Sequence, residues 1–206
     1  MWIWAVLVAA VSYLLGNLNG AVVASGMMHD DVRTHGSGNA GLTNFIRNYG
    51  LGHAFVVIAI DAGKAVAACA LGGLLLKPFG LALEGRMLGG LFVMLGHDFP
   101  ALLRFKGGKG ILSGWFIAWA VDWRVAVLIA AVFFTAYLLT GYVSLGSVLA
   151  AAAFGVGFAV WHCDNWLVMA TGIFMGILTV FMHRGNVSRL IKGEERKTNL
   201  FKRKGH

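Results

Sequence analysis

Charged residues are scarce in this sequence. Asp, Glu, Lys and Arg together make up 13% of its 206 residues, whereas hydrophobic residues make up 58%. The mean hydropathy of +0.74 exceeds what one water-soluble core of this size can bury, so a soluble domain is excluded. The alternating apolar and polar residues of a barrel strand are also missing. We therefore expect an all-α, polytopic membrane protein.

Several signals of other protein classes are absent as well. The two cysteines, Cys69 and Cys163, form no C-x-x-C pair and lie near no metal-ligand histidine spacing, so neither a disulfide nor a zinc site is expected. No G-x-S-x-G motif, no His followed by Asp five positions later and no cytoplasmic D-x-x-D pair occurs. We predict a mechanism without metal or cofactor. Residues 1–4 carry no charge, which predicts a retained first span rather than a cleaved signal peptide.

Apolar stretches of about the length that a bilayer requires recur along the whole chain. We expect seven transmembrane helices, at residues 2–24, 53–76, 86–103, 110–122, 125–141, 146–162 and 165–182. The fourth is short for a full crossing. No connection is long or polar enough to link separate cores, which predicts a single domain spanning residues 1–206.

The net charge of +8 and the pI of about 9.9 are compatible with nucleic-acid binding, but the basic residues are sorted by loop. One set of loops holds Arg33, Arg47, Arg104, Lys106, Lys109, Arg184, Arg189, Lys192, Arg196, Lys197, Lys202, Arg203 and Lys204. The other holds Lys77, Arg86 and Arg124. The positive-inside rule then predicts a cytoplasmic C-terminus, an external N-terminus and no nucleic-acid partner.

The first cytoplasmic loop, residues 30–47, is rich in glycine and in neutral hydrogen-bond donors. Gly36 and Gly38 let the backbone turn its N–H groups toward one point. The neutral polar side chains beside Arg47 are Ser37, Asn39, Thr43 and Asn44. This combination is suited to holding an anion. An ordinary polar connector has the same composition and is the alternative.

The second loop, residues 96–110, places three cations and three glycines between Arg104 and Gly110. Lys106, Gly107, Gly108 and Lys109 are typical of a phosphate site. The segment is not a P-loop, since no Ser or Thr follows the lysine. A basic patch that contacts anionic lipid is the alternative.

Two further pairs of polar residues lie close to predicted spans, one pair just after the last span and the other inside the second. If the chain stays helical after residue 182, His183 and Asn186 share one helix face. Asp61 and Lys64 are three residues apart within the second span, where an ion pair lowers the cost of burying charge. We expect structural pairing there. The three polar clusters at the cytoplasmic side predict one site for anionic substrates.

These motifs resemble those of the bacterial acyl-phosphate:glycerol-3-phosphate acyltransferase family, PlsY. The similar segments are residues 36–47, residues 96–110, and the run from His183 through Asn186 and Arg189 to Glu194 or Glu195. The resemblance covers nearly the whole chain. It implies transfer of a fatty acyl group from an acyl phosphate to glycerol 3-phosphate, which gives 1-acylglycerol 3-phosphate and phosphate, without coenzyme A or acyl carrier protein. It also implies a site at the cytoplasmic face of the bacterial inner membrane.

The resemblance implies a role for each motif. The catalytic residues would be Ser37, Arg47, Lys109, His183 and Asn186. The substrate-binding residues would be Gly36, Gly38, Asn39, Thr43, Asn44, His97, Lys106, Gly107, Gly108 and Glu194. We expect Ser37 to hydrogen-bond rather than to carry an acyl group, and either His183 or a donor phosphate oxygen to take the proton. An anion transporter and a noncatalytic membrane subunit are the alternative functions.

Overall fold

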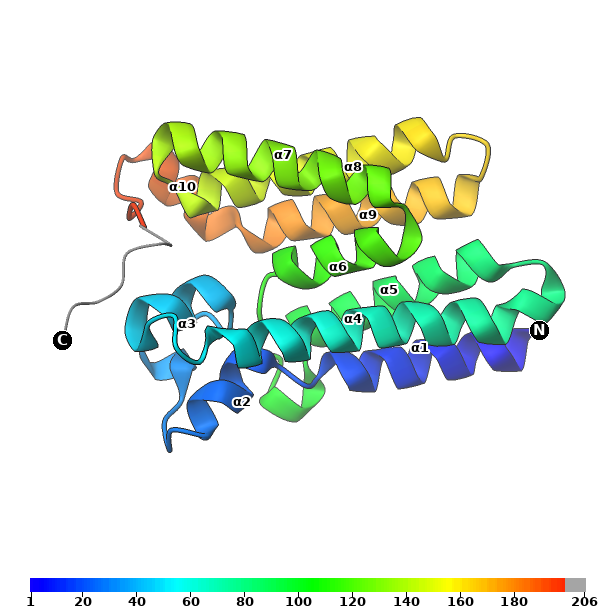
Figure 1. The fold of residues 1–206 in the computed structure, drawn as a ribbon, viewed down its shortest axis with the longest axis horizontal. Helices are drawn as coiled ribbons and strands as arrows, with labels where there is room; N and C mark the ends of the chain where they lie inside the picture. Colours follow the sequence, from blue (N-terminus) through cyan, green and yellow to red (C-terminus); the bar gives the residue numbers. More distant parts are fainter. Residues whose placement is uncertain (199–206) are drawn as a thin grey trace.

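The computed structural model describes residues 1–198, and every regular element in that range is a helix. The helices are α1 (Trp2–Gly16), α2 (Gly20–Gly26), α3 (Leu42–Tyr49), α4 (Ala54–Leu76), α5 (Ala82–Asp98), α6 (Ile111–Val121), α7 (Trp123–Thr140), α8 (Val143–Trp161), α9 (Trp166–Met182) and α10 (Arg184–Ile191), with 3-10 turns η1 (Val32–Thr34), η2 (Lys77–Phe79) and η3 (Ala101–Leu103). Helices α1, α4 and α5 pack together, as do α7, α8 and α9, and α6 lies between the two groups (Figure 1). Lys202, Arg203 and Lys204 lie outside the described residues.

Four stretches of the described residues are long and apolar enough to cross a bilayer: Trp2–Gly26, Ala54–Phe79, Trp123–Thr140 and Val143–Trp161. Helices α9 and α10 form a further candidate, bent by 55°. Helix α5 has 17 residues and α6 has 11, both shorter than a typical crossing. The predicted all-α class is confirmed for the described residues. The third predicted span is displaced: its helix begins at Ala82 and ends at Asp98, because Pro100 disfavours helix at the residue before it.

The first predicted span is not continuous, because the helix breaks at residues 17–19. The Asn19 side chain accepts hydrogen bonds from the backbone N–H groups of Ala21 at 3.0 Å and Val22 at 3.1 Å. Asparagine is a preferred N-cap because its side-chain oxygen satisfies the free donors of a helix start. A new helix, α2, therefore begins there.

The ion pair between Asp61 and Lys64 fastens this break to α4. Lys64 Nζ lies 2.8 Å from Asp61 Oδ1 and donates to the carbonyl oxygens of Gly16 at 3.3 Å and Leu18 at 2.7 Å. Asp61 Oδ1 accepts from the N–H of Gly20 at 3.2 Å. The pair thus satisfies the backbone groups that the break leaves without helical partners. The predicted structural pairing is confirmed.

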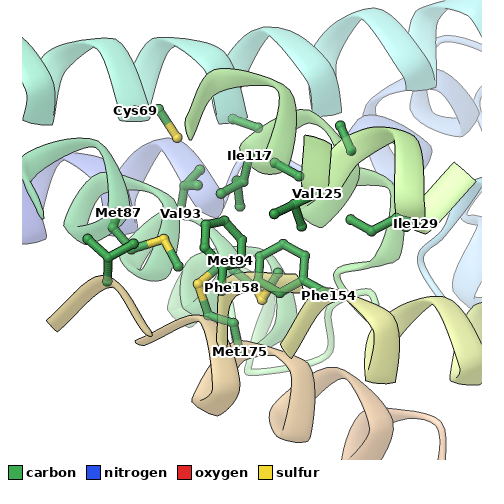
Figure 2. Close-up of a cluster of buried hydrophobic side chains, with 14 of the residues drawn as sticks. Cys69, Met87, Val93, Met94, Ile117, Val125, Ile129, Phe154, Phe158 and Met175 are labelled. Carbon is green, nitrogen blue, oxygen red and sulfur yellow. The ribbon is translucent and has the colours of Figure 1, made fainter. Parts of the chain in front are cut away.

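The main core joins the two helix groups through α6. Figure 2 shows Ile117 of α6 among Met94, Val125, Phe158 and Met175, which come from α5, α7, α8 and α9. All five side chains are buried. Small residues bring α4 against α5, since a Cβ at Gly72 would overlap the carbonyl oxygen of Gly85. This tight packing holds the helix ends at fixed relative positions.

The two ends of the bundle differ in what they carry. The N-terminus lies at the same end as the α4–α5 and α8–α9 connections, while α2, α3 and α10 cluster at the opposite end (Figure 1). The first predicted motif lies on α3 and on the connection that precedes it, the second on the end of α5 and the connection to α6, and the third on α10 and the residues beside it. Residues from all three motifs therefore gather at one end of the molecule.

Candidate active site

Two cavities meet at this end of the bundle. The first has a volume of about 1050 Å³ and is lined by the glycine-rich loop before α6, by residues 37–39 and by the start of α10. The second has a volume of about 470 Å³ and extends between α6, α7 and α8, where apolar side chains such as Ile129 and Phe133 line it. The residues that line both cavities are Ser37, Asn39, Lys109, Asn186 and Arg189. These five residues, which we call the junction, come from all three sequence motifs.

Asn44 organises the first loop. Its side chain is buried, accepts from the N–H of Ser37 at 3.0 Å and donates to the carbonyl oxygens of Val32 and Asn39, both at 3.0 Å. Gly36 packs against it with a φ of +59°, a conformation that glycine adopts easily. Of the predicted substrate-binding residues in this loop, Gly36 lines neither cavity. Asn44 and Thr43 line the second cavity, and Gly38 lines the first.

The glycines of the second loop allow it to fold directly onto His97. The N–H of Gly108 donates to the carbonyl oxygen of His97 at 3.0 Å, and a Cβ at Gly108 would overlap the His97 ring. A Cβ at Gly107 would overlap the His97 carbonyl oxygen. Lys106, Gly107 and Gly108 line the first cavity, whereas the buried His97 lines the second and accepts from Lys64 Nζ at 2.8 Å through Nδ1.

Lys109 belongs to a chain of polar contacts that crosses the junction. Its Nζ donates to Asn186 Oδ1, and Asn186 Nδ2 donates to Glu195 Oε1 at 3.0 Å. Arg189 Nε donates to Glu195 Oε2 at 2.7 Å. Burial, followed by the positive charge of Arg189, lowers the pKa of Lys109 to about 8. Lys109 is therefore a mostly protonated cation near neutral pH, without a carboxylate directly bonded to it.

His183 lies where α9 ends and α10 begins, at the bend between them. The predicted continuous helix through Asn186 is interrupted here, yet both side chains line the second cavity. His183 Nδ1 lies 2.8 Å from the carbonyl oxygen of Thr179. Because a carbonyl only accepts, Nδ1 carries the proton and a neutral ring keeps Nε2 as an acceptor. His183 thus has the tautomer that a base at the cavity wall requires.

Arg47 lies on α3 and lines the second cavity. Its Nε donates to Thr198 Oγ1 at 2.7 Å, and its Nη2 donates to the same oxygen and to the carbonyl oxygen of Arg196 at 3.3 Å. Burial lowers the pKa of Arg47, but a guanidinium remains charged at any physiological pH. With Lys109 and Arg189, Arg47 therefore adds a further fixed positive charge at this end of the second cavity.

The structure also brings into the site residues for which the sequence predicted no catalytic or binding role. Arg189 is at the junction, three residues after Asn186 on α10, and this helical spacing is a signal that the sequence contains. Glu195 is buried and bonded to Asn186, whereas Glu194 is exposed and lines neither cavity. Asp98 lines the first cavity, and its carboxyl oxygens have no hydrogen-bond partner among the described residues. Among the described residues, no group of three or more His, Cys, Asp or Glu side chains could hold a metal ion.

Known proteins with similar sequences cover almost the whole chain. The family model "Glycerol-3-phosphate acyltransferase" matches residues 6–193. A glycerol-3-phosphate acyltransferase of Thermoanaerobacter sp. (strain X514) is 35% identical over 196 residues, which are 94% of this chain and 96% of the relative. One of Finegoldia magna is 32% identical over 197 residues, 95% of this chain and 97% of the relative.

Solved structures share the fold. The glycerol 3-phosphate form of PlsY (YgiH), described as an integral membrane glycerol 3-phosphate acyltransferase, superposes with a TM-score of 0.84 at 30% identity and covers 96% of this chain and 99% of that one. Its lysophosphatidic acid form gives a TM-score of 0.80 at 31% identity over 95% of this chain and 96% of that one. The family match, the shared fold and the apolar helices together show that the chain belongs to the glycerol-3-phosphate acyltransferase family and is an integral membrane protein.

Proposed function

We propose that the protein moves a fatty acyl group from an acyl phosphate to the sn-1 hydroxyl of glycerol 3-phosphate. The products are 1-acylglycerol 3-phosphate and inorganic phosphate, and the reaction is the first acylation of phospholipid synthesis. The protein uses neither coenzyme A nor acyl carrier protein, and it uses no metal or cofactor. The glycerol 3-phosphate and lysophosphatidic acid forms of the solved relative support this acceptor and product.

One observation carries the proposal: a polar, basic cavity and a mainly apolar cavity share the five residues of the junction. The reaction needs such a pair, because the donor combines a long apolar chain with a phosphate and the acceptor is a small anion. The acyl chain fits between α6, α7 and α8, beside Ile129 and Phe133. The acyl carbonyl then lies at the junction, where Lys109 supplies positive charge.

The predicted residues divide between the two substrates. Lys106, Gly107 and Gly108 in the first cavity suit the phosphate of the donor. Arg47 and His183 at the polar end of the second cavity suit the acceptor. The residues that suit the reacting centre are those of the junction, namely Ser37, Asn39, Lys109, Asn186 and Arg189.

An acyl phosphate is a mixed anhydride and is already activated, so positioning and charge stabilisation are the main tasks of the site. The acceptor oxygen forms a bond to the acyl carbon, and the bond from that carbon to the phosphate oxygen breaks. His183 Nε2 or an oxygen of the departing phosphate takes the hydroxyl proton. Lys109 and the N–H groups of the glycine loop stabilise the charge on the leaving phosphate. Ser37 hydrogen-bonds and carries no acyl group.

The same proposal includes the topology. We infer a single domain with seven spans in the bacterial inner membrane, in which α5 and α6 cross despite their short length. The N-terminus faces outward, and the C-terminus and the site face the cytoplasm. The two sets of loops support this orientation. The connection that holds η2, from the set with few basic residues, lies at the N-terminal end of the bundle, whereas α3 and α10, from the basic set, lie at the other end (Figure 1).

Release of phosphate from palmitoyl phosphate tests the function. We expect purified protein in detergent, without added metal or coenzyme A, to release phosphate in proportion to the glycerol 3-phosphate supplied and to form 1-acylglycerol 3-phosphate. Glycerol lacks the anion and should be a far poorer acceptor. Monodisperse protein that releases no phosphate with both substrates present would exclude the proposed reaction.

The activity should fall as the pH rises through about 8, because the pKa of Lys109 is lowered to about 8 by burial and the deprotonated amine loses its charge. Below this pH the cation is present, so kcat/KM should change little on account of Lys109. A pH profile of kcat/KM checks this. Lys109→Arg keeps its charge throughout, so any activity it retains should lack the alkaline fall. A wild-type profile that stays flat well above pH 8 would contradict the prediction.

A further inference from the structure

The last described residues fold back over the site. Residues 194–198, which we call the strap, follow α10 and cross the connection between α7 and α8. The N–H of Thr198 donates to the carbonyl oxygen of Gly141 at 3.1 Å, and Tyr137 Oη donates to the carbonyl oxygen of Thr198 at 3.0 Å. Lys197 Nζ lies 5.3 Å from the centre of the Tyr142 ring. The strap thus has anchors that do not involve the Thr198 side chain, and it lies after the residues 6–193 that match the family model.

The Thr198 hydroxyl holds one edge of the Arg47 guanidinium. Nε and Nη2 of Arg47 both donate to Thr198 Oγ1, and Nη2 also donates to the carbonyl oxygen of Arg196. Within the described residues these are the hydrogen bonds of the Arg47 side chain. Nη1, with its two N–H groups, is left for a ligand in the second cavity, which Arg47 lines.

The chemistry of the contact matters as much as its geometry. A carboxylate in place of the Thr198 hydroxyl would also orient Arg47, but it would neutralise the positive charge that a phosphate ligand requires. A hydroxyl orients the guanidinium and leaves its charge intact. Charges of both signs act on Arg47, first the carboxylate of Glu195 and then the cations of Arg196 and Arg189, but none of them is hydrogen-bonded to its guanidinium through a side chain. The Thr198 hydroxyl therefore fixes the direction of the guanidinium.

We propose that Thr198 is a positioning residue for the acceptor. Its hydroxyl presents Nη1 of Arg47 to the phosphate of glycerol 3-phosphate, which lowers the KM for this substrate. The inference rests on the proposed function, because it assigns Arg47 to the acceptor. It extends the site to a residue 151 positions away in the sequence.

Thr198→Val removes the hydroxyl and keeps the shape of the side chain, and Thr198→Ser keeps the hydroxyl. For Thr198→Val we expect the KM for glycerol 3-phosphate to rise about tenfold, in line with the loss of hydrogen bonds to a charged group. The kcat and the KM for palmitoyl phosphate should stay within about twofold of wild type, since the donor phosphate lies in the other cavity. Thr198→Ser should restore the wild-type KM. A general loss of folding would instead lower the yield of active protein without this selective change.

A double-mutant cycle with Arg47→Met separates the two proposals. If Arg47→Met raises the KM for glycerol 3-phosphate and Thr198→Val adds nothing in that background, the Thr198 hydroxyl acts through Arg47 as proposed. If Arg47→Met raises this KM but Thr198→Val alone leaves it unchanged, the positioning role is wrong and the assignment of Arg47 stands. If Arg47→Met leaves it unchanged, the assignment of Arg47 to the acceptor fails, and the positioning role fails with it.

Discussion

Lys109→Met should lower kcat/KM at least about a thousandfold, because it removes a cation at the point where both cavities meet, and the other cation there, Arg189, is paired with Glu195. Methionine keeps most of the length of the side chain, so the loop before α6 should retain its shape. In the proposed mechanism the ammonium group lies where negative charge develops on the leaving phosphate, and its partner Asn186 is neutral. Steady-state phosphate release, with both substrates varied, measures the loss.

Lys192→Met is the matched control. Lys192 follows α10, is exposed and lines neither cavity, so the same substitution changes the net charge of the same face without touching the site. We expect kcat/KM to stay within about twofold of wild type. Equal losses in both variants would mean that the overall positive charge, rather than the position of Lys109, drives the reaction.

The largest effect on stability is expected for Lys64→Met. The substitution leaves the Asp61 carboxylate without its ion-pair partner and the carbonyl oxygens of Gly16 and Leu18 without their donor. Breaking a buried ion pair on one side typically costs about 3–5 kcal/mol, since one charge remains buried without compensation. Unfolding in mixed micelles, induced by a denaturing detergent, should show a loss of this size.

Two further variants test the cause of that loss. Lys77→Met changes an exposed lysine just after α4 and should leave the free energy of unfolding nearly unchanged. Asp61→Asn combined with Lys64→Met removes the uncompensated charge and should recover part of the stability. If the double variant is no more stable than Lys64→Met, the unmatched carbonyl groups rather than the carboxylate account for the cost.

Much of the fold could be predicted because lipid imposes a simple rule: a long apolar run must be helical. Each predicted span overlaps a helix of the structure. The break at residues 17–19 could not be predicted in the same way. A hydropathy window averages Asn17 and Asn19 with the apolar residues around them, and the group that makes the break tolerable, Lys64, lies in another helix.

The candidate site, too, could be predicted only in part from the sequence. The residues of the junction come from motifs that the sequence places at one side of the membrane, and the structure brings them together. Their chemical roles remain predictions. The choice of Glu195 over Glu194 depends on how the chain turns after α10, and the contact of Arg47 with Thr198 joins distant segments. Neither follows from local spacing.

The break in the first span also restricts the order in which the protein can be made. The carbonyl oxygens of Gly16 and Leu18 are satisfied by a lysine that leaves the ribosome 48 and 46 residues later. Unsatisfied carbonyl groups are costly in hydrocarbon. Until α4 has entered the membrane beside α1, the nascent chain must therefore keep residues 17–19 near water or in a continuous helix. The native first span is completed only after its partner helix arrives.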